Sequence, residues 1–131
     1  MATKTWTSQA DWQTWTGDAG WDTTTTPGSV TIAAGQLSTV GVSPAYEATD
    51  WASGYWRVFK VTGTRAAGTI YYLRFKTATT SAGLATATYS EYINGVDADG
   101  VITFDMRSWC RNNVAWNVGP WIQIELTLES D

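Results

Sequence analysis

The sequence has no histidine and a single cysteine, Cys110, among its 131 residues. Histidine is the usual proton shuttle near neutral pH and the commonest metal ligand, so its absence disfavours imidazole catalysis and a histidine metal centre. Cys110 lacks both a second cysteine for an internal disulfide and a histidine to act as its base. We therefore expect a small, buried or half-buried apolar side chain at Cys110. We also expect no enzymatic activity, no cofactor and no metal.

Charge and long apolar runs are scarce as well. Charged residues make up 15% of the chain and the net charge is −4, which opposes attraction to phosphate backbones. Residues 1–15 begin with Met but lack the apolar stretch of an export signal, and no run approaches the ~18–20 residues that span a membrane. We therefore expect synthesis in a reducing cytoplasm, with no nucleic acid and no membrane among the partners.

What the chain has in excess is tryptophan, with nine residues. Each buried aromatic side chain removes ~150–250 Å² from water, and tryptophan is enriched at contact surfaces. Thr, Ala, Gly and Ser are abundant while Lys and Glu are scarce, a mixture that favours strands and turns over helices. A chain rich in contact surface and poor in catalytic groups is typical of a binding or assembly module.

Alternation of apolar and polar residues predicts the strands. The clearest is 121–128, where Ile122, Ile124, Leu126 and Leu128 share the inward face. Further strands are expected at 101–107, 69–77, 55–61, 29–33, 36–42 and 86–93. In two of them the apolar faces are Ile102, Phe104 and Met106, and Tyr71, Leu73 and Phe75. Only 81–88 has room for a helical turn, and turn formers occupy 26–28, 63–68 and 97–100.

Short strands at this spacing predict an all-β fold, an antiparallel β-sandwich with jelly-roll topology. We expect one sandwich domain over 1–131, with the tryptophan-rich segment 1–26 packed on it. That segment contains a small duplication, because Trp6 and Trp12 are echoed nine residues later by Trp15 and Trp21. We favour two strand–turn units whose tryptophans fill similar positions, and a repeated ligand-contacting edge is the alternative.

Carboxylates can serve as metal ligands or as catalytic groups. Residues 97–100 read Asp-Ala-Asp-Gly, the start of a calcium loop, but the later acidic ligand is absent, so a hairpin turn is the better interpretation. A glycosidase needs two carboxyl groups ~5–10 Å apart. Capping of turns is the favoured role for the seven candidates, which are Asp11, Asp18, Asp22, Glu47, Asp50, Glu91 and Asp105.

Aromatic residues beside polar ones mark the candidate binding site. It comprises Trp51, Tyr55, Trp109, Arg111, Asn113 and Trp116. Trp116 lies in a polar loop at 111–120, where an exposed indole can stack on a sugar or anchor a protein contact. The alternative is an indole folded back over the end of the sandwich, and the two interpretations carry equal weight.

A family resemblance extends these expectations. The landmarks at 27–33, 35–40, 55–58, 68–77 and 121–128 are similar to galactose-binding-like sandwich modules of bacteriophage tail fibres, virion accessory proteins and bacterial surface proteins. The resemblance spans about residues 27–128 and implies a β-sandwich that serves adhesion, decoration or glycan contact. It carries over no catalytic residue.

These observations predict a non-catalytic structural protein of a virus particle, either a capsid decoration protein or a tail accessory or fibre module. Its expected partners are capsid or tail proteins and further copies of itself in a homo-oligomer, and its expected location is the virion. The alternative is an extracellular or cell-surface carbohydrate-binding module that stacks tryptophans on the sugar rings of glycans.

Overall fold

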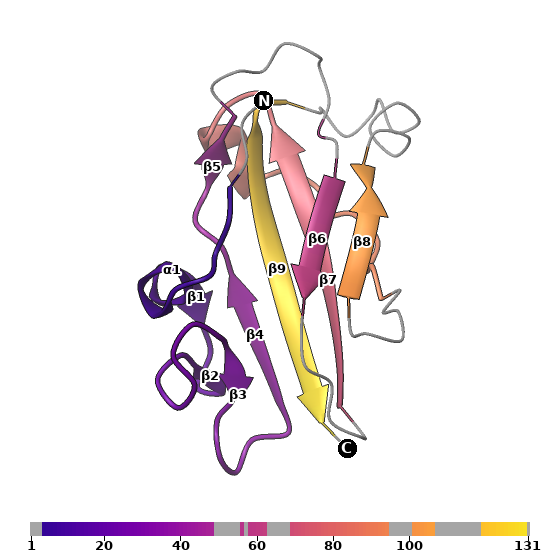
Figure 1. Ribbon diagram of the computed structural model, residues 1–131. Coiled ribbons are helices and arrows are strands. Elements are labelled where there is room, and N and C mark those ends of the chain that lie inside the picture. Colours follow the sequence, from indigo (N-terminus) through magenta and orange to yellow (C-terminus); the bar gives the residue numbers. More distant parts are fainter. Residues whose placement is uncertain are drawn as a thin grey trace.

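The computed structural model describes residues 4–48, 56, 58–62, 69–94, 101–106 and 119–130 (Figure 1). These residues form an all-β structure of antiparallel sheets with little helix. The strands are β1 (Thr16–Gly17), β2 (Trp21–Asp22), β3 (Thr31–Ile32), β4 (Ser38–Val42), β5 (Tyr46–Glu47), β6 (Val58–Thr62), β7 (Thr69–Ala78), β8 (Val101–Asp105) and β9 (Trp121–Ser130). The helical elements are α1 (Gln9–Gln13) and the 3₁₀ turn η1 (Ala82–Ala85).

Strand β9 is the centre of the main sheet. It pairs with β7 along one edge over the full ten residues of both strands, and with β4 and β5 along the other edge. Strand β1 extends the sheet beyond β4, while β2–β3 and β6–β8 form two separate antiparallel ribbons. Figure 1 shows β9 in yellow, running between β4 and β7.

The predicted alternation of β9 is confirmed on its apolar face. Ile122, Ile124 and Leu126 are buried, and Leu128 is half-buried against the same core. The polar face departs from the prediction at Thr127, which is only 5% exposed. Thr127 lies between the outward-facing residues of β4 and β7, so flanking strands cover it on both sides.

The core lies on the inner face of this sheet. Tyr71, Leu73 and Phe75 of β7 are buried there, as their alternation predicts. Ile102 and Met106, from β8 and the residue after it, join the same cluster, so the β6–β8 ribbon packs on the main sheet. The side chain of Phe104, predicted to share this face, lies outside the described residues.

The prediction of a regular strand at 86–93 is wrong, because this segment pairs with β7 only at isolated positions. The N–H and carbonyl of Leu73 bond to Ile93, while those of Phe75 bond to Ser90, so one residue of β7, Arg74, opposes two residues of the adjoining segment, 91 and 92. This extra residue is a β-bulge, which interrupts the ladder. The Ser90 hydroxyl supplies the acceptor for the Phe75 N–H at 3.0 Å. The segment 81–88 does hold a helical turn, η1, but it is not the only one, because α1 is helical as well.

The N-terminal segment contains a helix where two strand–turn units were predicted. The side chain of Ser8 accepts from the Asp11 N–H, and Asp11 accepts from the Ser8 N–H, a capping box that starts α1. The first tryptophan repeat is therefore helical, and only the second carries the short strands β1 and β2. The duplicated residues still converge, because Trp6, Trp12, Trp15 and Trp21 form one ring cluster, named here the tryptophan cluster.

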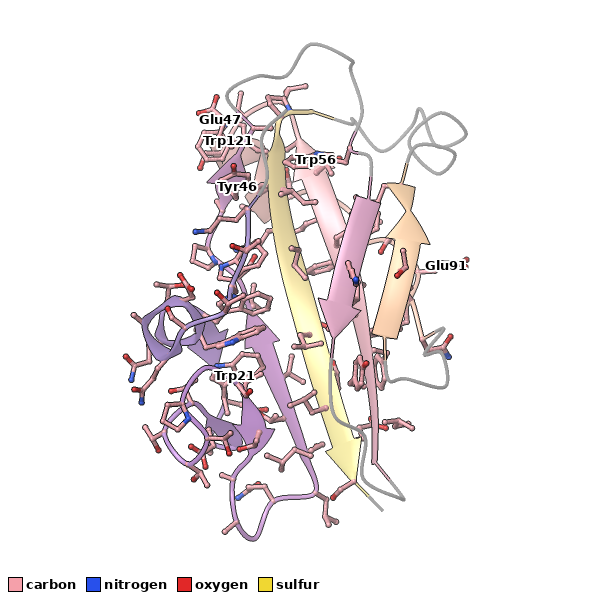
Figure 2. The ribbon with its side chains drawn as sticks, in the orientation of Figure 1. Trp21, Tyr46, Glu47, Trp56, Glu91 and Trp121 are labelled. Carbon is pink, nitrogen blue, oxygen red and sulfur yellow. The ribbon has the colours of Figure 1, made fainter. Side chains whose placement is uncertain are left out.

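Two glycines make room for the tryptophan cluster. A Cβ atom at Gly17 or Gly41, which are paired across β1 and β4, would lie less than 3.0 Å from three atoms of Trp21. The Trp21 side chain therefore lies directly on the backbone of both strands, and Figure 2 shows it beside β4. Its ring stacks on Trp15, with centroids 5.7 Å apart and planes 16° apart.

The turn predicted at 26–28 is confirmed. The Ser29 N–H donates to the Thr26 carbonyl at 3.1 Å, and Gly28 has φ 89°, a conformation that other residues rarely adopt. The Gly28 carbonyl in turn accepts from the Trp12 indole at 3.1 Å, which ties this turn to the tryptophan cluster. The predicted turns at 63–68 and 97–100, like Cys110, lie outside the described residues.

Candidate functional site

All six residues of the sequence-predicted site lie outside the described residues. They are Trp51, Tyr55, Trp109, Arg111, Asn113 and Trp116. Their roles, and the choice between an exposed and a core position for Trp116, stay predictions. The described part of the chain offers a different surface on the outer face of the main sheet.

This surface, named here the tyrosine–arginine patch, consists of Ile70, Tyr72, Arg74, Tyr89 and Tyr92. Its centre is Arg74, whose guanidinium carbon lies 4.2 Å from the ring centroid of Tyr89 and 4.9 Å from that of Tyr92. The rings of Tyr72 and Tyr92 meet edge to face, with centroids 5.0 Å apart. A cation held between aromatic faces is stabilised by their quadrupoles and by stacking.

The β-bulge puts both outer tyrosines beside Arg74. Tyr89 and Tyr92 are three residues apart, and in a regular strand this spacing would send them to opposite faces. The segment has one extra residue between Ser90 and Ile93, so both of these residues keep their bonds to β7. As a consequence, Tyr89 and Tyr92 both reach the outer face. Sequence alternation alone does not reveal this arrangement.

Two glutamates of β9 accept hydrogen bonds from residues of the patch. Glu125 receives a bidentate pair of bonds from Arg74, at 2.9 Å from Nε and 3.1 Å from Nη2. Glu129 accepts a 2.6 Å bond from the Tyr72 hydroxyl, and this bond, with burial, raises the pKa of Tyr72 to about 12. These bonds fix the side chains of Arg74 and Tyr72 in position.

Side chains on the polar face of β9 make hydrogen bonds within the protein that the sequence does not reveal. Glu125 has a side chain only 12% exposed and is taken up by Arg74, and Gln123 donates to the Ser43 carbonyl at 2.9 Å. Both side chains are therefore bonded within the protein and are not free to contact a partner. The exposed contact groups belong instead to the neighbouring residues Tyr92, 51% exposed, and Ile70, 45% exposed.

The carboxylates of the N-terminal segment have structural roles, as their turn positions predict. Bonds from Ser8 and Thr7 lower the pKa of Asp11, and the Thr39 hydroxyl lowers that of Asp18. Asp18 also accepts from the Val40 N–H at 3.0 Å, which fastens the β1–β2 turn to β4.

Asp22 caps its own turn. It accepts bonds from the hydroxyls and N–H groups of Thr24 and Thr25, and these bonds lower the pKa of its carboxyl. Among the remaining candidate carboxylates, only the side chains of Glu47 and Glu91 are described. Glu47 and Glu91 lie on opposite sides of the molecule in Figure 2, while Asp50 and the side chain of Asp105 lie outside the described residues. Within the described ranges, no group of three or more acidic or cysteine side chains is placed to hold a metal ion.

No protein-family model, curated protein or solved structure matches this chain. No helix in the part of the chain that the structure describes is long and apolar enough to cross a membrane. The function is therefore inferred from the arrangement of the side chains themselves.

Proposed function

We propose that this protein is a non-catalytic structural module that acts through protein–protein contacts made by the tyrosine–arginine patch. The observation that carries the proposal is the stack of Tyr89, Arg74 and Tyr92 on the outer face of β7. Tyrosine and arginine are enriched among the residues that dominate protein interfaces. Their fixed positions here reduce the entropy lost when a partner docks.

The proposed setting is a virus particle, where the module decorates the capsid or serves as a tail accessory or fibre component. This part of the proposal is supported by the resemblance of 27–128 to virion sandwich modules and by a surface suited to contact rather than catalysis. A jelly-roll sandwich is proposed with it, and the packing of the β6–β8 ribbon on the main sheet supports the sandwich layering. The partners are capsid or tail proteins and further copies of the chain.

Sedimentation velocity over a wide concentration range tests the patch. Self-association is expected for the wild-type protein and should weaken about 30-fold or more in Tyr92→Ala, since truncating a central aromatic typically costs ~2 kcal/mol or more. Tyr92→Phe keeps the ring and should retain most of the association. Gln13→Ala, an exposed change on α1, is the control for effects unrelated to the patch.

Two results would contradict the proposal. One is a strict monomer at high concentration that also fails to bind purified capsid or tail proteins. The other is association that Tyr92→Ala leaves unchanged. The carbohydrate-binding alternative built on Trp109 and Trp116 stays a prediction, which glycan binding by the wild-type protein and its loss in Trp116→Ala would support.

A further inference from the structure

A second surface feature lies on the N-terminal side of the molecule, away from the patch. It is a groove of about 230 Å³ between the segment that precedes α1 and the segment that leads into β5. Trp6 and Tyr46 line it with aromatic rings, Pro44 adds an apolar ring, and Lys4 and Asp11 add one charge of each sign.

The two aromatic side chains are held in place by neighbours. Trp6 meets Trp15 of the tryptophan cluster edge to face, with centroids 5.4 Å apart. Tyr46 belongs to β5, pairs with Ile122 of β9, and has its ring 6.4 Å from that of Trp56. Both rings are half-buried, so each is fixed by the core while part of its surface stays open. Figure 2 shows Tyr46 and Trp56 near the same end of β9.

Unused hydrogen-bonding groups surround these rings. The Oδ2 atom of Asp11 accepts bonds from the N–H groups of Thr7 and Ser8 and from the Ser8 hydroxyl. Its Oδ1 atom has no partner among the described residues. The same holds, within these ranges, for the ammonium of Lys4, which lies 5.7 Å from the Trp6 centroid, and for the hydroxyl of Tyr46.

We propose that this groove binds a single saccharide ring. A sugar ring has apolar C–H faces, which suit Trp6 and Tyr46, and a rim of hydroxyls that both donate and accept. Asp11 Oδ1 supplies the acceptor and Lys4 the donor, and because their charges cancel, a neutral polyhydroxylated ligand fits better than an ion. The volume lies below the ~300–1,000 Å³ of pockets for drug-sized ligands, which limits the site to about one ring.

This site is independent of the proposed protein-binding patch, and it is also distinct from the predicted sugar platform at Trp109 and Trp116. Saturation-transfer NMR on the full chain tests it, with the methyl glycosides of glucose, galactose, mannose and N-acetylglucosamine as probes. Ala45→Trp fills the groove from an exposed position without removing a packed side chain. Lys4→Met removes the ammonium and keeps most of the stem, and exposed Gln13→Ala is the matched control.

The expected result is transfer to the C–H protons of at least one glycoside in the wild-type protein and in Gln13→Ala. Transfer should be lost in Ala45→Trp, and the affinity should fall roughly tenfold in Lys4→Met. Absence of transfer from every glycoside to the wild-type protein overturns the proposal, and so does transfer that survives in Ala45→Trp. Equal affinity in Lys4→Met overturns the role of Lys4. Tyr92→Ala should bind the glycoside like the wild-type protein, which separates this test from that of the patch.

Discussion

The β7–β9 ladder and the tryptophan cluster reach stability by different routes. The ladder joins two ten-residue strands in continuous register, and its inner face consists of alternating apolar side chains with one polar residue, Thr77, opposite Ile122. The tryptophan cluster is built on two-residue strands and a five-residue helix beside β4, so ring contacts, caps and glycines hold it together. Regular alternation spreads stability over many equivalent positions, while the cluster concentrates it at a few.

The cluster contains buried polar groups without a partner among the described residues, as the ladder does at the Thr77 hydroxyl of β7. The indole N–H groups of Trp15 and Trp21 are buried without an acceptor among the described residues. A buried donor without a partner costs about 1–3 kcal/mol. Stacking of these two rings, and their contacts with Trp12, have to offset that cost, so small shifts in ring position should weaken the cluster strongly.

The largest expected effect is on the ladder. Leu126→Ala should lower the free energy of unfolding by about 2–5 kcal/mol, because it opens a cavity beside Leu73 in the centre of the core. Urea denaturation measures the loss. Ser130→Ala, at the end of the same strand, is the control and should unfold almost like the wild-type protein. Equal losses in the two variants would contradict the register of β9.

The next effect is on the tryptophan cluster. Gly41→Ala forces the Trp21 ring off the sheet and should cost about 1–3 kcal/mol, the usual range for overpacking. Near-ultraviolet circular dichroism should show a change in the tryptophan signal of Gly41→Ala. Leu126→Ala should not produce such a change specific to tryptophan. Ser38→Ala, an exposed change in β4, should leave the spectrum intact. An unaltered spectrum in Gly41→Ala would mean that Trp21 does not lie on this glycine.

A smaller effect is expected on the outer face of the ladder. Tyr72→Phe removes the bond to Glu129 and should cost about 0.5–1.5 kcal/mol. Since the folded pKa of Tyr72 is raised to about 12, this stabilisation is present below the ordinary value of 10.0 and is lost as the pH rises through about 12. Absorbance titration should show one late-ionising tyrosine fewer in Tyr72→Phe. Identical titration curves would contradict the bond.

The smallest effect concerns acid and the tryptophan cluster. The folded pKa values of Asp11, Asp18 and Asp22 lie below the ordinary 3.8, so their contribution to stability is present above that pH and is lost as the pH falls through the folded values. The near-ultraviolet tryptophan signal should therefore weaken before the far-ultraviolet strand signal below about pH 4. Asp22→Asn should reduce this acid dependence. Simultaneous loss of both signals in both proteins would contradict the assignment.

The β7–β9 ladder could be predicted from the sequence more fully than the tryptophan cluster. Alternation at 121–128 and 69–77 predicts β9, β7 and their buried faces, because period-two burial is visible in the sequence. The burial of Thr127 was missed, since it depends on neighbours in two other strands. The helix α1 was missed too, although Ser8 and Asp11 have the spacing of a capping box, because a five-residue helix has too little periodicity to stand out.

The patch shows a different limit of sequence reasoning. Tyr72 and Arg74 are correctly placed on the outward face of β7 by alternation. Tyr89 and Tyr92 join them only through the bulge, and the bulge depends on tertiary pairing of Ser90 and Ile93 with β7. The all-β class follows from composition and alternation, whereas binding surfaces depend on such irregularities.

Hydroxyl-radical footprinting tests most directly whether the tyrosine–arginine patch makes the protein contact. The wild-type protein is compared at concentrations where it is monomeric and where it is assembled, and the modification of single side chains is read by mass spectrometry. Tyr89 and Tyr92 should become protected on assembly, while Trp6 and Tyr46 in the groove keep their reactivity. Unchanged modification of both patch tyrosines in the assembled protein would contradict the account.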